Sequence, residues 1–222
     1  MNVELKYLLC SEKQLPIIYA IRGGHINIVR LLIDEFPDSL WRLNYNNKQV
    51  QLPIYWAAQY GKMEIIRIVH EAYPNGISLN NEDYNERLLL PLHIAAIYGH
   101  TAVVQYLYHE YPPAIYARTS LGKLPLHFAA ETGCLSTVEY LSGVYTDGIS
   151  TKDESSYLPF HCAVEECDDD LDVVMYLYTK YPNGIKEKVR DGSLPMHLSV
   201  ERGYLEVTKW LYDSYIYPSI VQ

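Results

Sequence analysis

The stretch LPLHIAAIYGH, residues 90–100, decides the fold, because a close copy, LPLHFAAETGC, begins 34 residues later at Leu124. Related phrases containing Leu-Pro occur six times, and a period of about 20–50 residues is the sequence signature of a repeat architecture. We therefore divide the chain into an N-terminal lead-in or partial cap, residues 1–14, and six repeats over residues 15–222. The repeats start near residues 15, 52, 90, 124, 158 and 194.

Each repeat has the pattern of two short helices. The proline suits the first position of a helix, where its missing N–H is not needed. A glycine eight positions later suits the left-handed residue that ends a helix, and it recurs at Gly24, Gly61, Gly99, Gly133 and Gly203. Apolar residues then follow at helical spacing, as at Val103, Val104 and Leu107. A Tyr-Pro pair or a relative ends this second helix, and we expect an extended segment and a turn to lead back to the next Leu-Pro.

The segment LPLHIAAIYGHTAVVQYLY, residues 90–108, resembles the ankyrin-repeat phrase TPLHxA, followed by Gly-His and a Val-Val-x-x-Leu-Leu helix. The resemblance covers about residues 15–216. It implies an all-α ankyrin-repeat solenoid of helix-turn-helix units with hairpin-like connecting fingers, which binds a partner on a concave face made of fingers and first helices. Two departures stand out: the helix-capping Thr of the family is Leu in every repeat, and Tyr-Pro replaces the Gly-Ala after the second helix.

A histidine recurs in four repeats, as His93, His127, His161 and His197. One hypothesis makes these residues a metal cluster or a general base. Zinc ligands lie about 2.0–2.1 Å from the ion, whereas residues one repeat apart are separated by roughly 10 Å if helix spacing governs the stack. Equivalent histidines therefore cannot share an ion. We predict that each histidine bonds to local backbone and braces the turn at the start of its first helix.

Two other groups of residues resemble a metal or redox site, but their spacing does not fit one. In EECDDDLD, residues 165–172, three aspartates mimic the start of a calcium loop, but Val173 and Thr179 stand where Gly and Glu are required. We interpret this run as a solvated turn whose acids favour the N-terminus of the following helix. Cys162 and Cys167 could form a redox or metal pair, although buried small apolar residues fit better. The chain contains no phosphate loop, GxSxG or HExxH motif, so we expect no catalytic residue, cofactor or metal and no enzyme activity.

Composition limits the classes of partner. The formal net charge of −9 argues against a nucleic-acid partner, which needs clustered Lys and Arg. The four cysteines form no CxxC pair, which indicates a reducing, intracellular and cytoplasmic location. No apolar run approaches 18 residues, so we expect no membrane insertion, and the first ten residues lack the apolar core of a signal peptide.

The 22 tyrosines, against 3 phenylalanines, divide into two groups. Those that recur at fixed positions of the second helices predict packing between repeats, as at Tyr106, Tyr140 and Tyr176, with Trp210 in the last repeat. Those that break the pattern predict recognition, because tyrosine offers contact area and a hydrogen bond at low entropic cost. The predicted partner-binding residues are Arg22, Tyr45, Gln59, Tyr60, Tyr84, Ile97, Tyr98, Arg118, Glu131, Thr132, Tyr157, Glu201 and Arg202.

The longest fingers, LNYNNKQVQ and LNNEDYNERLL, follow the first two repeats. Insertions of this kind enlarge a binding edge, so we expect the N-terminal half to be the recognition end. The function predicted is that of a scaffold that binds another protein. Two alternatives remain open at this point: a targeting or regulatory segment of a larger multidomain enzyme, and self-association into a homo-oligomer through exposed tyrosines.

Overall fold

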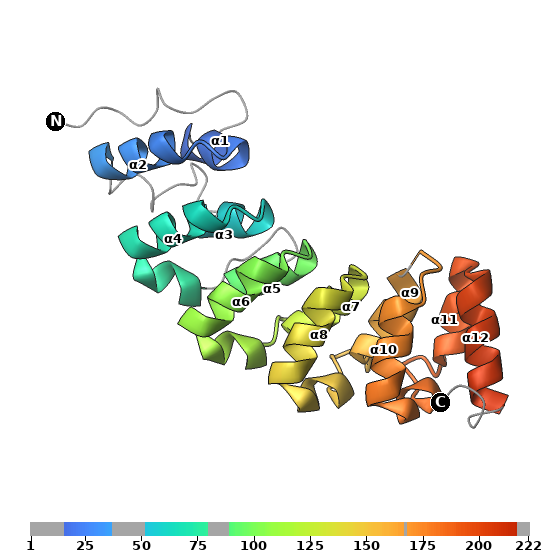
Figure 1. Cartoon of the computed structure of the whole chain (residues 1–222). Helices are drawn as coiled ribbons and strands as arrows, with labels where there is room; N and C mark the ends of the chain where they lie inside the picture. The colour runs from blue at the N-terminus through green and yellow to red at the C-terminus, as the bar shows by residue number, and fades with distance from the viewer. Residues whose placement is uncertain (1–15, 37–51, 80–88, 167, 217–222) are drawn as a thin grey trace. The chain divides into compact units, whose positions relative to one another are not determined.

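The computed structural model describes residues 16–36, 52–79, 89–166 and 168–216 (Figure 1). The regular secondary structure of these residues consists of α-helices and short 3₁₀ helices, which confirms the all-α fold class. The described residues fall into two compact units. Unit 1 extends to residue 95 and includes residues 102–114, and unit 2 comprises residues 96–101 and those from 115 onward.

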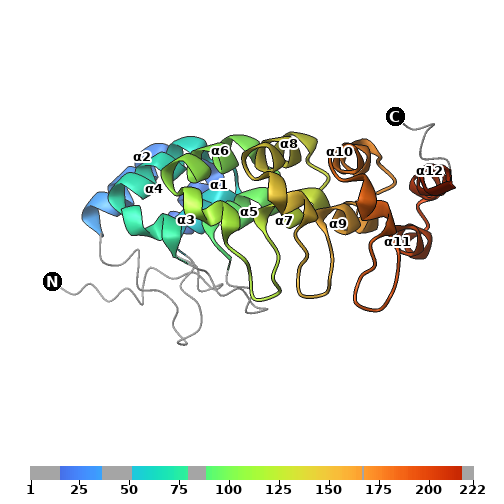
Figure 2. The ribbon, with the colours of Figure 1, turned by 90° about the horizontal axis from the view of Figure 1, so that it is seen from below.

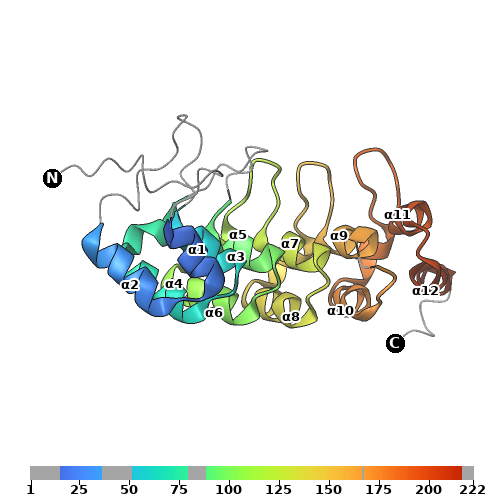
Figure 3. The same cartoon turned by 90° about the horizontal axis from the view of Figure 1, so that it is seen from above.

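Unit 1 is built from pairs of helices (Figure 3). Its elements are α1 (Pro16–Gly23), α2 (Ile26–Glu35), α3 (Pro53–Gln59), α4 (Met63–Ala72), the 3₁₀ helix η3 (Pro74–Ser78), most of α5 (Pro91–Ile97) and nearly all of α6 (Thr101–Glu110). First helices pack on first helices, as α1 does on α3, and second helices on second helices, as α2 does on α4. Ile54, Ile65 and Ile66 are almost completely buried between these layers.

Unit 2 repeats the same arrangement. After η4 (Pro112–Tyr116), its elements are α7 (Pro125–Glu131), α8 (Leu135–Val144), η5 (Thr146–Ser150), α9 (Pro159–Glu166), α10 (Asp172–Lys180), η6 (Pro182–Lys186), α11 (Pro195–Arg202) and α12 (Leu205–Ile216). The first helices α7, α9 and α11 form one layer, and α8 and α10 pack together in the other. Three connecting loops project from the first-helix side of this unit (Figure 2). We call them finger A (residues 117–123), finger B (151–158) and finger C (187–194).

The signals that the sequence gives for each helix pair are confirmed. The prolines stand at the first position of their helices, and the five recurring glycines have φ between 62° and 77°, the left-handed conformation that ends the first helix. The fifth repeat lacks this glycine. Its chain turns instead through Asp168 and Asp169, with φ of 48° and 66°, a conformation that aspartate tolerates better than most residues.

The segment after each second helix differs from the expectation. Tyr-Pro does end the helix, and the Tyr73 N–H donates to the Val69 carbonyl as the last helical bond. The chain then forms a 3₁₀ helix, which the sequence pattern did not predict, before the expected extended segment and turn. The physical reason is a buried isoleucine in each of these turns, which anchors it to the core. These residues are Ile77, Ile115, Ile149 and Ile185.

The recurring aromatic side chains of the second helices pack between repeats, as predicted. In unit 1 the Tyr106 hydroxyl lies 2.8 Å from Nδ1 of His70 on the preceding second helix. In unit 2 the Tyr176 hydroxyl lies 2.9 Å from the Ser142 hydroxyl. The contacted residues, His70 and Ser142, occupy the same position of the preceding second helix, four residues after the buried Ile66 and Val138.

Candidate functional site: the finger edge

The recurring histidine binds the backbone at the start of the first helix through its Nδ1 atom. Nδ1 of His93, His127, His161 and His197 accepts a hydrogen bond from the backbone N–H of the Leu that precedes the helix, over 3.0, 3.1, 3.0 and 2.9 Å. This bond satisfies the N–H of the Leu at the N-cap, one of the orphan N–H groups at the helix start. The predicted structural role of the histidine is confirmed.

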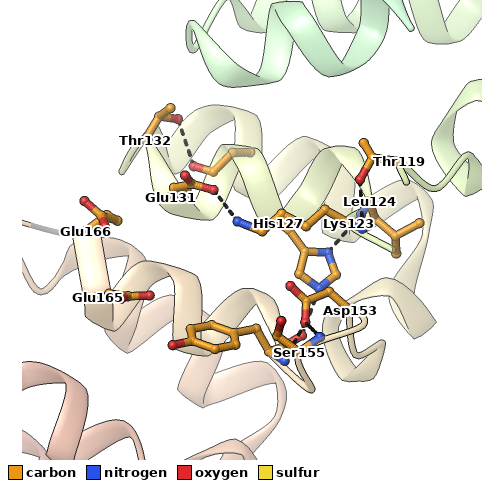
Figure 4. Close-up of polar contacts among 12 residues, drawn as sticks. Thr119, Lys123, Leu124, His127, Glu131, Thr132, Asp153, Ser155, Glu165 and Glu166 are labelled. Atoms are coloured by element: carbon orange, nitrogen blue, oxygen red, sulfur yellow. Dashed lines mark hydrogen bonds and ion pairs between the residues drawn. The ribbon is translucent and has the colours of Figure 1, made fainter. Parts of the chain in front are cut away.

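The second ring nitrogen reaches the next finger. Because Nδ1 accepts, the ring proton belongs on Nε2. From there it is donated to the Tyr157 carbonyl of finger B in the case of His127, and to the Glu187 carbonyl of finger C in the case of His161, each over 3.1 Å. Figure 4 shows His127 between Leu124 and the backbone of finger B. Each of these two histidines therefore fixes a first helix to the finger that leads to the next repeat.

This environment holds the histidines neutral. Burial lowers the pKa of His127 from 6.5 to about 3, and the cations Lys123 and Arg118 act in the same direction, against its bond to Tyr157. Burial also lowers the pKa of His161. Neither side chain is exposed to solvent. A neutral, fully bonded imidazole has no free lone pair for a metal or a substrate.

A pH dependence of stability follows from the lowered pKa of His127. The unfolded chain binds more protons than the folded one between pH 6.5 and pH 3, so the contribution is complete above pH 6.5 and is lost as the pH falls toward 3. We expect the free energy of unfolding to fall by about 1.4 kcal/mol per pH unit in this range, or about 2 kcal/mol between pH 6.5 and pH 5. Urea denaturation at several pH values measures it. The variant His127→Asn should show a shallower slope, and an unchanged slope would contradict the assignment.

The fingers of unit 2 are closed by tight turns. In fingers A and C, the N–H of Thr119 bonds to the Lys123 carbonyl and that of Val189 to the Ser193 carbonyl; in finger B, Asp153 bonds in the same way to Tyr157. One residue of each turn has positive φ, as expected of a hairpin loop. These residues are Gly122, Ser156 and Gly192, with φ of 75°, 66° and 90°. The predicted hairpin-like form is therefore present in the three connections of unit 2.

Neighbouring fingers are also bonded to each other. The Glu154 N–H donates to the Leu121 carbonyl over 3.0 Å, and the Arg190 N–H to the Ser155 carbonyl over 2.9 Å. The Arg118 guanidinium adds a bond to the Lys152 carbonyl at 3.0 Å. Main-chain bonds thus run from finger A through finger B to finger C, and the three loops form one continuous edge.

Charged side chains fill the space between the fingers and the first helices. Lys123 Nζ lies 2.8 Å from Oε2 of Glu131 (Figure 4). Burial would lower the pKa of Lys123, but the carboxylates of Glu131 and Asp153 raise it above its ordinary value. The lysine therefore stays charged. Burial, together with the nearby Glu165 and Asp191, raises the pKa of Tyr157 to about 12.

The structure places the predicted binding residues unevenly. Gln59, Tyr60, Ile97, Glu131 and Tyr157 are half-buried, whereas Arg22, Tyr98, Arg118, Thr132, Glu201 and Arg202 are exposed. Tyr45 and Tyr84 lie outside the described residues, as do most of the two long fingers. In unit 2 the structure brings Arg118 to the finger edge, and Glu131 and Thr132 to the end of α7. Arg22, Gln59 and Tyr60 belong to unit 1.

Several of these side chains are occupied by internal contacts. The Thr132 hydroxyl donates to the Ala129 carbonyl at 3.1 Å. Arg202 pairs with Glu165 at 3.1 Å and with Glu166 at 2.5 Å. Sequence reasoning missed Lys123 and Asp153, which hold the fingers in place. The available signal was a charged residue directly before the Leu-Pro of the fourth repeat, at Lys123.

The acidic run behaves as a helix-capping turn, with one unexpected bond. Asp170 Oδ1 accepts the Asp172 N–H at the start of α10, as the interpretation required. Asp169 acts farther away: its carboxylate accepts the N–H groups of Glu206 and Val207, at 3.2 and 3.0 Å, at the N-terminus of α12. The insertion in the fifth repeat therefore supplies a cap for the second helix of the sixth.

Several further features bear on chemistry. Cys162 is buried, in agreement with its interpretation as a small apolar residue, whereas Cys167 lies outside the described residues. Within the residues that the structure describes, no three His, Cys, Asp or Glu side chains gather closely enough to hold a metal ion. None of the helices in this part of the chain combines the length and the apolar character that crossing a bilayer requires.

Paired helices, left-handed glycines and finger loops in register define a helical repeat protein. Family models agree: a model of ankyrin repeats in three copies matches residues 2–83 and 126–221, and a model of ankyrin repeats in many copies matches residues 75–129. The chain belongs to the ankyrin-repeat family. This family consists of generic protein–protein interaction modules and is typically non-catalytic. No curated protein matches the sequence.

Proposed function

We propose that the chain recognises a partner protein along the finger edge of unit 2 and the adjoining ends of its first helices. The bonds between neighbouring fingers carry this proposal. They hold the loops in one conformation before any partner arrives, so that little ordering entropy is lost on binding. Loops that are fixed by a rigid scaffold are a common place for binding residues.

The exposed side chains on this surface suit a protein partner. Tyr98, at the end of α5, is 49% exposed and stacks against the His100 ring with 6.4 Å between centroids. An aromatic ring held by a neighbour makes a good anchor, because its rotamer is already restricted. Glu201 and Arg118 add charges on the same side of the repeats, and such charges tune the choice of partner more than the affinity.

The sequence-based hypothesis of an N-terminal recognition end stays a prediction. It depends on two fingers of which most residues lie outside those described. At the position that corresponds to Tyr98, unit 1 carries Tyr60, which stacks on Trp56 with 6.0 Å between ring centroids. Tyr60 is half-buried, so Tyr98 offers more surface to a partner.

We expect the Tyr98→Ala variant to bind its partner about tenfold more weakly, or worse, because it removes a central aromatic anchor. The partner is first captured with the full chain and identified, and its dissociation constant is then measured by titration calorimetry. Met175→Ala is the matched control, since Met175 is 42% exposed but lies on a second helix, α10. Equal affinities of wild type and Tyr98→Ala, or an equal loss with Met175→Ala, would contradict this binding face.

A further inference from the structure

The last helix pair of unit 2 exposes apolar side chains at positions that other repeats bury. Val200, on α11, is 61% exposed, whereas its equivalents Ala130 and Val164 are fully buried. Tyr212, on α12, is 55% exposed, but the equivalent Tyr178 is only 7% exposed. We call Val200 and Tyr212, together with Leu205 at 59% exposure, the C-terminal face.

Contacts inside unit 2 explain this difference. The edge of Trp210 packs on Tyr178, with 5.1 Å between ring centroids, and this contact buries Tyr178 beneath the following repeat. Tyr176 covers Ser142 in the same way one repeat earlier. The C-terminal face therefore consists of the positions that a following helix pair of the same kind would cover.

The first helix pair of unit 1 also exposes apolar side chains at positions that another repeat buries, here on the side that would face a preceding repeat. Ile28 and Leu31, on α2, are 48% and 57% exposed. At the equivalent positions of α4, Ile65 and Ile68 are 1% and 6% exposed. Leu31 also corresponds to Trp210, the residue that contacts the preceding repeat. We call Ile28 and Leu31 the N-terminal face (Figure 3 shows α2 within unit 1).

Charged side chains near the N-terminal face and the C-terminal face are complementary. Arg22, at the end of α1, and Glu201, at the end of α11, occupy equivalent places on their first helices, and both are exposed. Within unit 2, this part of the first helix already carries an ion pair between successive repeats, where Arg202 meets Glu165 at 3.1 Å. An α1–α2 pair that stacked beyond α12 would bring Arg22, which stands one residue before the equivalent of Arg202, close to Glu201, which is the equivalent of Glu165.

We propose that a second copy of this chain packs its N-terminal face on the C-terminal face, in the register of successive repeats. Three observations support a second copy as the partner. The contact would continue the interface between successive repeats, the N-terminal face and the C-terminal face are both apolar, and Arg22 and Glu201 carry opposite charges. The contact is heterologous, because different surfaces meet, and such contacts extend head to tail or close into rings.

Sedimentation velocity over a range of concentrations tests the proposal with the full chain. We expect the mass of the wild type to rise with concentration to that of dimers and larger species. Val200→Asp places a charge in the C-terminal face, and Leu31→Asp places one in the N-terminal face. Each variant alone should stay monomeric, with association about tenfold or more weaker than in the wild type. Met175→Asp, on an exposed side of α10, should associate as the wild type does.

A mixture of the two variants gives the sharpest outcome. Leu31→Asp keeps an intact C-terminal face and Val200→Asp an intact N-terminal face, so the mixture should form a one-to-one dimer and nothing larger. Circular dichroism spectra identical to that of the wild type show that the variants are folded. A monomeric wild type up to about 1 mM, where a contact worth about 4 kcal/mol would be detected, overturns the proposal. Association of Leu31→Asp alone also overturns it, since it would mean that the C-terminal face pairs with itself.

Discussion

Replacing His127 with alanine is expected to lower the free energy of unfolding by about 3–5 kcal/mol. The buried Leu124 N–H loses its partner, which costs about 1–3 kcal/mol. The Tyr157 carbonyl loses one of its two hydrogen bonds and keeps the one from the Asp153 N–H. The missing ring also leaves a cavity in a fully buried site. Chemical denaturation at pH 7 measures the loss, with the transition midpoint and slope compared between variants.

His197→Ala is the matched control for this prediction. His197 accepts the same bond, from the Leu194 N–H at 2.9 Å, but its side chain lies in an exposed position. Its replacement should cost only about 1 kcal/mol, the usual value of a helix cap. Equal losses in the two variants would mean that the bond from His127 to finger B contributes nothing to stability. A loss below about 1 kcal/mol for His127→Ala would contradict the role of His127 as a link between α7 and finger B.

Gly122→Ala is expected to destabilise the protein by about 3 kcal/mol. Gly122 has a φ of 75°, and alanine in the left-handed region costs roughly 1–2 kcal/mol. The new Cβ would in addition lie 2.9 Å from the backbone nitrogen of Glu154 in finger B, closer than such atoms can approach. Finger B would have to move and would lose its bond to the Leu121 carbonyl, worth about 1 kcal/mol.

Gly192→Ala separates the two contributions. Gly192 occupies the same place in finger C, with a φ of 90°, and a Cβ there would meet nothing within 4 Å. Only the conformational cost remains, so the loss should be about 1–2 kcal/mol. Hydrogen exchange of the Glu154 amide should speed up in Gly122→Ala and stay slow in Gly192→Ala. Equal losses and unchanged exchange would mean that the fingers are not coupled.

Much of the fold follows from local signals in the sequence. Proline at the first helical position and glycine in the left-handed region act within a few residues of themselves, so their effect can be predicted without knowing the packing. The buried positions of the second helices follow from spacing, and Val104, Val138 and Val174 are indeed fully buried. The 3₁₀ turns were missed although a signal existed, because an isoleucine recurs three residues after each helix-ending Tyr-Pro or Tyr-Thr pair.

The candidate site was less predictable, because its contacts join residues that are distant in sequence. Asp169 caps a helix 37 residues further along the chain, and spacing alone favoured only the adjacent helix. Arg202 and Thr132 were chosen as exposed residues at variable positions, but the structure shows both bonded to neighbouring groups. Such pairings depend on which side chains the stacking of repeats brings together, and a pattern read along one repeat does not contain that information.

His127 and His161 link first helices to fingers and leave no ring nitrogen free for a ligand or a substrate. Imidazole ¹⁵N spectroscopy, recorded as a pH titration, tests it most directly. We predict that His127 and His161 keep their proton on Nε2, that His127 remains neutral at pH 5, and that the pKa of His161 lies below the ordinary histidine value of 6.5. Rapid exchange of the proton between both nitrogens of His127, titration near pH 6.5, or a shift of its signals on addition of zinc would contradict the account.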